Sequence, residues 1–197
     1  MEKRSLLIGA ALEVIGEDGL SGFTQPRVAR RAGLRQSHLT YYFPTRDDLL
    51  LAVADEAVRR RVEALGSALA VPSRSAKVAA LVAVLTDPAQ TRVLLALTQA
   101  ADSSLAVRSS FAVLAAGLAP LSVDLLNAFG VEVTESSVGL LQAASTGIAV
   151  LALATGGVDF PRRAEDLLTD FLTRRGGTDR LSAPPNLTSD QHPSPTD

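Results

Sequence analysis

The side chains best suited to binding a ligand lie between Thr24 and Leu50. The basic residues there are Arg27, Arg30, Arg31, Arg35 and Arg46, and no acidic residue lies between Thr24 and Arg46. The polar residues among them are Gln25, Gln36, Ser37, His38, Thr40, Tyr41 and Tyr42. Guanidinium groups pair with phosphate oxygens, and amides and hydroxyls form hydrogen bonds with base edges. The composition fits a nucleic-acid interface or, alternatively, a solvated basic face on a structural helix hairpin.

The same stretch carries the signals of two short helices joined by a tight turn. Thr24 is a favourable N-cap, and Pro26 fits the first turn of a helix. Gly33 permits the tight turn because glycine takes positive φ without strain. The second helix is expected to end at Phe43, because Pro44 disfavours α geometry in the residue before it. This is the helix-turn-helix plan, in which one helix braces another that enters a DNA groove, and it favours the nucleic-acid interpretation.

Residues 1–53 resemble the N-terminal domain of the TetR family of transcriptional regulators. The family pattern has an Ala-Gly turn, a short recognition helix, an aromatic cluster ending in Phe, and a basic residue before an acidic, leucine-rich helix. The matching residues are Ala32-Gly33-Leu34, Gln36 to Tyr42, Phe43, Arg46 and Asp47-Asp48-Leu49-Leu50. The rest of the chain resembles the family only in length and helical character.

The resemblance implies roles for individual residues. Gln36 and Ser37 occupy positions where bases are contacted, and a glutamine can form two hydrogen bonds with adenine. The positions implied to touch phosphates are His38, Tyr41, Tyr42 and Arg46, and Thr24 and Gln25 add contacts from the start of the preceding helix.

Two positions depart from the family pattern. Arg35 stands where a small N-capping residue is usual. The helix is expected to lose the hydrogen bond of that cap, and the arginine is expected to contact a phosphate or a base instead. Thr40 stands where tyrosine is frequent, and it keeps a hydroxyl with shorter reach. Tyr41 is equally compatible with core packing, and Phe43 is expected to be a core residue.

Composition limits the other functions. The net charge of −2 and pI near 5.7 hide a basic run that is local, and the chain has no cysteine. His38 and His192 lie far apart, and the sequence has no Gly-rich phosphate loop and no nucleophile–His–acid set. We therefore expect no enzyme, metal or cofactor. The N-terminal apolar run is broken by Glu13 and has no cleavage signal, so a soluble cytoplasmic protein is expected.

Helical periodicity predicts an all-α protein with a three-helix head and a larger helical body. One expected helix follows the N-cap Thr24, and the others cover residues 3–18, 36–42, 46 to 65 or 68, 74–85, 88–100, 104–116, 121–129, 134–155 and 161–175. Pro120 is expected to end or kink its helix. The expected domains are a helix-turn-helix DNA-binding domain at 1–48, a ligand-binding and dimerisation domain at 49–175, and a disordered tail rich in Pro, Ser and Thr at 176–197.

Residues 136–158 carry no charged side chain and are long enough to cross a bilayer. However, the segment lacks an aromatic belt and basic flanks, so we expect no membrane insertion but a helix buried all round. The resemblance implies a homodimer formed by the last two long helices. The candidate interface residues are Ala143, Ala144, Gly147, Leu151, Leu168 and Phe171. A twofold dimer is expected to face a palindromic operator in double-stranded DNA.

The resemblance also implies a small-molecule effector bound in the body. The body contains Phe but no Tyr or Trp, so an aliphatic pocket for an apolar, mostly neutral effector is expected. The candidate polar residues are Gln90, Thr98, Gln99, Asp102, Asn127 and Gln142.

The resulting hypothesis is a DNA-binding regulator whose effector favours a dimer that no longer matches the operator spacing. Repression is the usual mode of the family, and activation stays open. The alternative is a helical ligand-binding or interaction protein that no longer reads DNA. The basic residues and Gln36 favour the first hypothesis.

Overall fold

The structure, a computed structural model, describes residues 2–156 and 159–176. Within these ranges the chain forms only helices, which confirms the all-α class: α1 Glu2–Gly22, α2 Gln25–Arg31, α3 Gln36–Tyr42, α4 Arg46–Leu69, α5 Arg74–Leu85, α6 Pro88–Ser103, α7 Leu105–Phe129, α8 Glu135–Thr155 and α9 Phe160–Gly176. The segment predicted to be a disordered tail lies outside the described residues, apart from Gly176, which ends α9.

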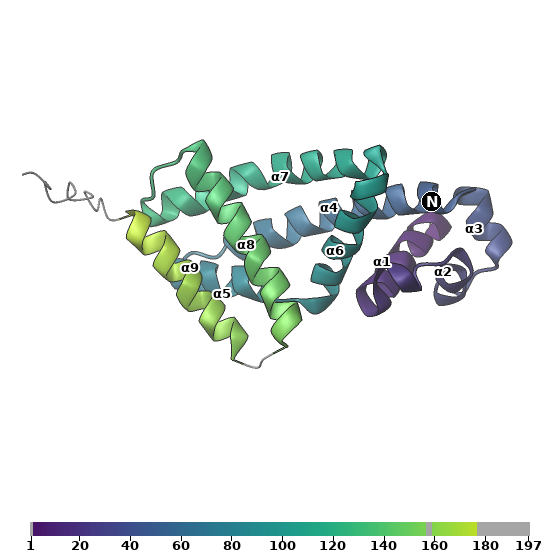
Figure 1. Cartoon of the computed structure of the whole chain (residues 1–197), viewed down its shortest axis with the longest axis horizontal. Helices are drawn as coiled ribbons and strands as arrows, with labels where there is room; N and C mark the ends of the chain where they lie inside the picture. Colours follow the sequence, from purple (N-terminus) through teal and green to yellow (C-terminus); the bar gives the residue numbers. More distant parts are fainter. Residues whose placement is uncertain (1, 157–158, 177–197) are drawn as a thin grey trace, which may run out of the picture.

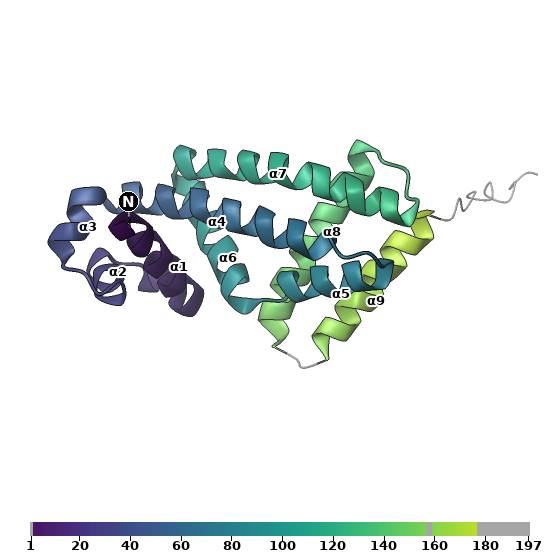
Figure 2. The same cartoon turned by 180° about the vertical axis from the view of Figure 1, so that it is seen from behind.

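The helices are arranged along one long axis. Helices α1 to α3 form one end, and α5, α8 and α9 form the other (Figure 1). Helices α4 and α7 run side by side between the two ends, and α6 connects the level of α5 to the start of α7 (Figure 2). Helix α4 therefore extends from the head into the body.

Helix α1 has a break at Gly19, directly after residue 18, where the helix was expected to end. This residue has φ 68° and ψ −167°, and the helical assignment continues past it to Gly22. Before the break, Leu7, Ala11 and Val14 form a fully buried stripe at helical spacing. The regular part of the helix thus ends where the sequence predicted, although the helix as a whole continues to Gly22.

Helix α4 begins with a reciprocal capping box. The Thr45 hydroxyl accepts a hydrogen bond from the Asp48 amide at 3.0 Å, and the Asp48 carboxylate accepts one from the Thr45 amide at 2.9 Å. The Thr45 hydroxyl also donates to Asp48, and these bonds lower the pKa of its carboxyl. This cap fixes the start of the long helix directly after the recognition helix.

Helix α7 corrects the prediction for Pro120. The sequence predicted two helices, at 104–116 and 121–129, but residues 105–129 form one helix with Pro120 inside it. A proline removes one backbone hydrogen bond, and the turns on both sides are held by packing against α4, α6 and α8. Local propensity is thus overridden by tertiary contacts.

The buried residues form two clusters. The first joins the head to the body, because Leu7, Val28 and Leu39 share it with Leu97 of α6 and Val107 of α7. The second joins the end of α4 with α5, α7, α8 and α9, around Leu85, Leu126 and Leu168. The core of the head therefore continues into α6 and α7 beyond the predicted boundary at residue 48.

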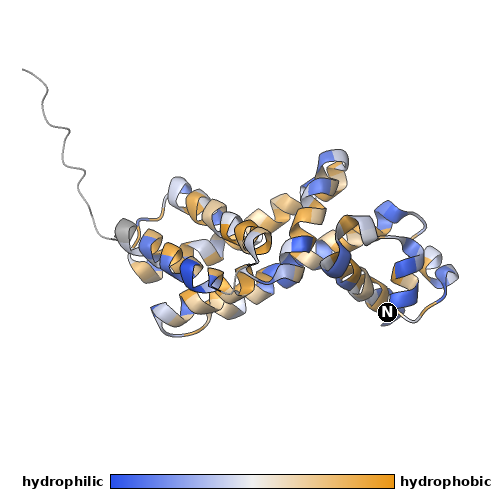
Figure 3. Cartoon of the chain, turned by 60° about the horizontal axis from the view of Figure 1, so that its bottom comes forward, coloured by the Kyte–Doolittle hydropathy of each residue, from blue (hydrophilic) through white to orange (hydrophobic). Residues whose placement is uncertain are grey.

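Helices α7 and α8 are long and apolar enough to cross a membrane, judged by length and composition alone, as is the bent pair of α5 and α6. Only 22% and 17% of the most apolar windows of α7 and α8 are buried within the chain. The expectation that α8 is buried all round is therefore wrong for a single chain, and Leu140 and Leu151 lie exposed on it. Figure 3 shows apolar colouring over much of the body helices.

The crossing of α4 and α7 gives a prediction for stability. A methyl group at Gly117 would lie 2.9 Å from Val62 Cγ2, whereas one at Gly66 would meet Leu121 at an ordinary 3.8 Å. Alanine improves helix propensity by roughly 0.5–1 kcal/mol at either site. Overpacking against a stiff valine costs about 1–3 kcal/mol. In urea unfolding, we expect Gly117→Ala to be less stable than the Gly66→Ala control. Equal stabilisation of both variants would contradict this packing.

Candidate nucleic-acid interface and ligand pocket

Helices α2 and α3 form the predicted helix-turn-helix. Gly33 turns the chain with φ 67°, and the Leu34 amide donates to the Ala29 carbonyl at 2.9 Å. Val28 and Leu39 are fully buried and hold the two helices against α1. Leu39 is the one buried residue of α3, so most of this short helix faces away from the core.

The outer face of α3 carries polar side chains. The exposed residues are Arg35, Gln36, Ser37, Thr40 and Tyr41. Tyr41 is 80% exposed, which excludes core packing for it, whereas Phe43 is buried as expected. As expected for Arg35, its side chain makes no capping hydrogen bond.

The other polar residues of α3 have partners within the helix or lie deeper. The Thr40 hydroxyl donates to the Gln36 carbonyl at 3.2 Å, so it is partly occupied by its own helix. Tyr42 is half-buried, and its ring meets the Tyr41 ring edge-on at 5.1 Å. His38 is half-buried, and its Nδ1 atom has no hydrogen-bond partner among the described residues.

Two of the predicted contact residues also brace the head. Gln25 donates from Nε2 to the Phe43 carbonyl at 3.2 Å, at the end of α3. The Arg46 guanidinium lies 5.2 Å from the centre of the Phe23 ring, and its Nε donates to the Phe23 carbonyl at 3.4 Å. Thr24 occupies the N-cap position of α2 and is exposed, but its side chain makes no capping hydrogen bond.

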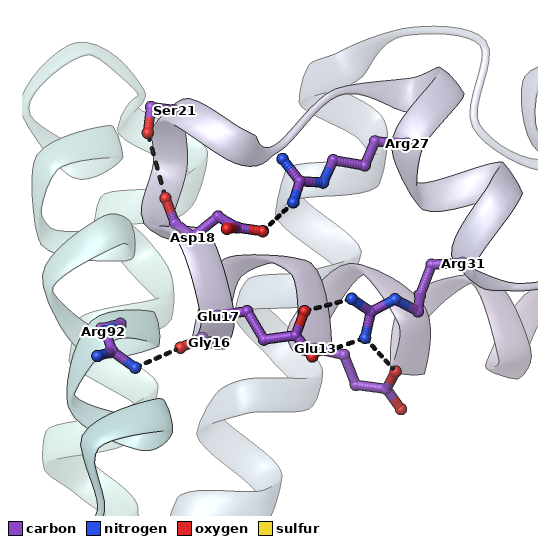
Figure 4. Close-up of polar contacts among 8 residues, drawn as sticks. All are labelled: Glu13, Gly16, Glu17, Asp18, Ser21, Arg27, Arg31 and Arg92. Carbon is purple, nitrogen blue, oxygen red and sulfur yellow. Dashed lines mark hydrogen bonds and ion pairs between the residues drawn. The ribbon is translucent and has the colours of Figure 1, made fainter.

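The basic residues of α2 are largely used inside the head (Figure 4). Arg27 pairs with Asp18, and Arg31 pairs with Glu17 and, at 3.3 Å, with Glu13. The bond from Arg31 lowers the pKa of the Glu17 carboxyl. Fewer arginines are therefore available to DNA than the sequence indicates, because acidic residues of α1, which precede this stretch, pair with Arg27 and Arg31.

Sequence reasoning missed one basic residue near α3. The Arg4 guanidinium of α1 lies 5.4 Å from the centre of the Phe43 ring, at the end of the recognition helix. The signal was the pair Lys3-Arg4 at the start of an amphipathic helix, which the sequence alone does not connect to residue 43.

A pocket of about 470 Å³ lies where the head meets the body. It is lined by α1, α4, α6 and α7, and its volume is within the usual range for small-molecule sites. The apolar lining includes Leu12, Ala57, Val58, Val93, Leu97, Phe111 and Leu114, and the polar lining is Glu13, Glu17, Arg60, Arg61, Gln90 and Ser110. The pocket therefore includes helix α1 of the head, which the sequence did not predict.

A second pocket of about 210 Å³ lies deeper in the body and reaches α8. The two pockets share the residues Arg61, Leu94, Phe111 and Leu114. The shared residues form a wall that an occupant of either pocket touches.

The predicted polar pocket residues divide into two groups. Gln90 lines the first pocket and Gln142 the second. Thr98, Gln99, Asp102 and Asn127 line neither pocket and are exposed. The structure does not place these four residues in a pocket, because they lie on the outer faces of α6 and α7. Helical periodicity alone did not indicate which face of each helix is the inner one.

Arg61 differs from the two arginines before it. A run of three arginines such as Arg59-Arg60-Arg61 is typical of a solvated helix face, and Arg59 and Arg60 do pair with Glu56 or Glu63 on the surface of α4. Arg61 instead turns inward and lines both pockets. Burial lowers the pKa of its guanidinium.

The candidate dimer residues also divide. Ala143 and Leu151 are exposed, and Ala144, Gly147 and Phe171 are half-buried. Leu168 is completely buried in the second core cluster of its own chain. The assignment of Leu168 to the dimer interface is therefore corrected, because its side chain packs inward and has no surface that a partner could contact.

This arrangement is the fold of a helix-turn-helix transcriptional regulator, with a helical body that contains two pockets. Residues 7–53 match the model of the bacterial regulatory proteins of the tetR family. This match confirms the resemblance of the N-terminal domain to the TetR family that the sequence predicted.

Solved structures share the fold over most of the chain. A TetR-family member from Streptomyces coelicolor is 25% identical with a TM-score of 0.66, covering 87% of this chain and 98% of its own. The multidrug binding protein EbrR, solved with ethidium, is 26% identical with a TM-score of 0.65, covering 86% and 98%. A Rhodococcus transcriptional regulator is 20% identical with a TM-score of 0.67, covering 87% and 95%. A comparison with curated protein sequences found no significant match.

The two kinds of arginine in the head give a second prediction. Arg35 is exposed at the start of α3, whereas Arg31 is paired with Glu13 and Glu17. We expect Arg35→Ala to weaken DNA binding and to reduce the slope of log affinity against log salt by roughly one. Arg31→Ala, the control, should leave that slope unchanged. Binding titrations at several salt concentrations measure both, and a loss of slope only in the Arg31 variant would contradict the assignment.

Proposed function

We propose that this protein is a homodimeric regulator that binds a palindromic operator through α3 and leaves it when a small molecule occupies the pocket between head and body. The observation that carries the proposal is the pocket itself, because one cavity is lined by α1 of the DNA-binding head and by α4, α6 and α7 of the body. An occupant contacts both parts at once.

The proposed DNA contacts follow from the exposed face of α3. Gln36 and Ser37 read base edges, and Arg35, Thr40 and Tyr41 extend from the same helix. The proposed phosphate contacts, which fix the register of the protein on the duplex, are His38, Tyr42, Arg46, Thr24 and Gln25, with Arg4 added from α1. Arg46 and Gln25 thus combine bracing of the head with a contact to DNA.

The proposed dimer forms through α8 and α9. Leu140 and Leu151 of α8 and Leu167 of α9 are exposed large apolar residues, and Ala143 lies on the same part of α8. Exposed apolar residues gathered on neighbouring helices are typical of a protein–protein interface. Because a twofold dimer presents two recognition helices, its operator has two related half-sites.

The proposed coupling runs through α1. A methyl group at Gly16 would lie 3.2 Å from Ala89 Cβ, so α1 and α6 are in close contact there. Arg92 Nη1 of α6 also donates to the Gly16 carbonyl at 3.0 Å (Figure 4). Since Arg31 ties α2 to Glu13 and Glu17, a shift of α1 against α6 moves the helix-turn-helix with it.

The effector acts by binding one head orientation better than the other. The similarity to EbrR, which was solved with ethidium, supports a small-molecule site in this fold. We propose repression as the mode of action and a cytoplasmic location, as the resemblance implies. A helical ligand-binding protein that no longer reads DNA is the second candidate, and the internal pairing of Arg27 and Arg31 is the observation that favours it.

Base reading by α3 is tested with Gln36→Ala. On a duplex that carries the preferred site, we expect the loss of two hydrogen bonds to weaken binding by about 1–3 kcal/mol. On random duplex DNA of equal length and at equal salt, affinity should stay the same. An equal loss on both duplexes would contradict base reading by Gln36.

The dimer is tested with a charge on α8. Leu151 is 52% exposed on the proposed interface, and Leu105 is 79% exposed at the start of α7. We expect Leu151→Glu to shift the protein towards monomer in sedimentation experiments, because the dimer would bury an unpaired carboxylate. Leu105→Glu is the matched control and should stay dimeric. A dimer that survives Leu151→Glu and fails with Leu105→Glu would assign the interface to α7.

A further inference from the structure

We propose that the effector is an amphipathic carboxylate, whose anionic group pairs with Arg61 while its apolar part fills the pocket. This inference rests on the proposed function, because it assigns a chemical class to the occupant of the same pocket.

Arg61 is a cation without a carboxylate partner among the residues that the structure describes. Its Nη1 atom donates to Gln90 Oε1 at 3.0 Å and to the Val84 carbonyl at 3.3 Å, and both acceptors are neutral. Neither Nε nor Nη2 has a hydrogen bond within the described part of the chain. The guanidinium therefore keeps donors in a fork geometry that matches a carboxylate.

The neighbouring arginines make Arg61 distinctive. Arg59 forms ion pairs with Glu56 and Glu63, and Arg60 forms one with Glu56. Arg60 also lines the first pocket, but its side chain, like that of Arg59, is 54% exposed and already paired with a carboxylate. Arg61 is half-buried and has no paired carboxylate, and a partly desolvated charge in that condition is costly until an anion pairs with it.

The one acid whose charge acts on Arg61 does not pair with it. Asp87 acts on Arg61 only at a distance, and its Oδ1 atom caps α6 by accepting from the amides of Ala89 and Gln90 at 2.8 and 3.1 Å. Ser110, another polar lining residue, donates to Asp55 at 3.2 Å. The anion that completes the Arg61 environment must then come from outside these residues.

The carboxylates of the pocket lie on α1 and are already paired. Glu13 and Glu17 both bind Arg31 and are more than half exposed. A cationic ligand would have to compete with Arg31 and with water there, whereas an anion meets an unpaired guanidinium at Arg61. The charge of the pocket therefore favours an anionic ligand, in contrast to the cationic ethidium bound by EbrR.

The apolar part of the ligand follows from the other lining residues. Leu94, Phe111 and Leu114 stand beside Arg61 in the wall that both pockets share. A ligand held at Arg61 can extend along Leu12 and Leu97 towards the head. The neutral effector expected from composition is thus replaced by a carboxylate, because the sequence did not reveal that Arg61 turns inward.

The test compares three probes with the same alkyl chain on the full-length protein: decanoate, decanol and decyltrimethylammonium, each below its micelle concentration. We expect decanoate to bind at least about tenfold more tightly than either other probe in calorimetry, as a charge-assisted hydrogen bond allows. Arg61→Gln should lower decanoate affinity about 10- to 100-fold and leave decanol binding unchanged. The matched control Arg59→Gln should retain the preference for decanoate.

A second variant keeps the test decisive if Arg61→Gln does not fold. Arg61→Lys retains the charge but loses the planar fork, so it should bind decanoate more weakly than the native protein and still prefer it to decanol. Decanoate binding that is unchanged in Arg61→Gln and Arg61→Lys would overturn the proposal, as would tighter binding of decyltrimethylammonium or no preference among the probes.

The proposed function is measured separately in the same samples, without any probe. Operator binding by the native protein tests the regulator, and the probe preference tests Arg61. A protein that binds DNA and shows no preference for decanoate refutes only the ligand class. A protein that prefers decanoate and does not bind DNA refutes only the regulatory role.

Discussion

The contact between α1 and α6 is the constraint on which the rest of this structure depends. At Gly16, α1 lies so close to α6 that a methyl group on this residue would be 3.2 Å from the Cβ atom of Ala89. Arg92 of α6 also donates a hydrogen bond to the Gly16 carbonyl. The first core cluster crosses this contact, so the helix-turn-helix is packed onto the body rather than suspended from α4. A close contact of this kind transmits a small displacement, because packed interiors shift as units.

The ion pairs of the head explain how a basic stretch is divided between structure and recognition. Arg27 and Arg31 bind acids of α1, while Arg35 stays exposed beside Gln36. Internal pairing fixes the angle at which α2, and hence α3, leaves α1. The same helix α1 lines the pocket, so the groups that hold the recognition helix in place adjoin the space that a ligand would fill.

The head could be predicted from the sequence because its signals are local. Gly33 marks the turn, Pro44 marks the end of α3, and both act within a few residues of the chain. The errors concern residues whose environment is set by distant helices: Pro120 continues α7, Arg61 turns inward, and Leu168 packs into its own chain. The pocket at the head was missed for the same reason, since α1 and α6 are separated by most of the N-terminal half of the chain.

The most direct test of the account is selection of binding sites from random duplex DNA with the purified full-length protein at near-physiological salt. The account predicts a palindrome whose half-sites are about one helical turn apart, or a multiple of it, since two α3 helices related by a twofold axis read the same face of the duplex. Recovery of sequences with no shared site, with weak binding that vanishes as salt rises, would contradict it.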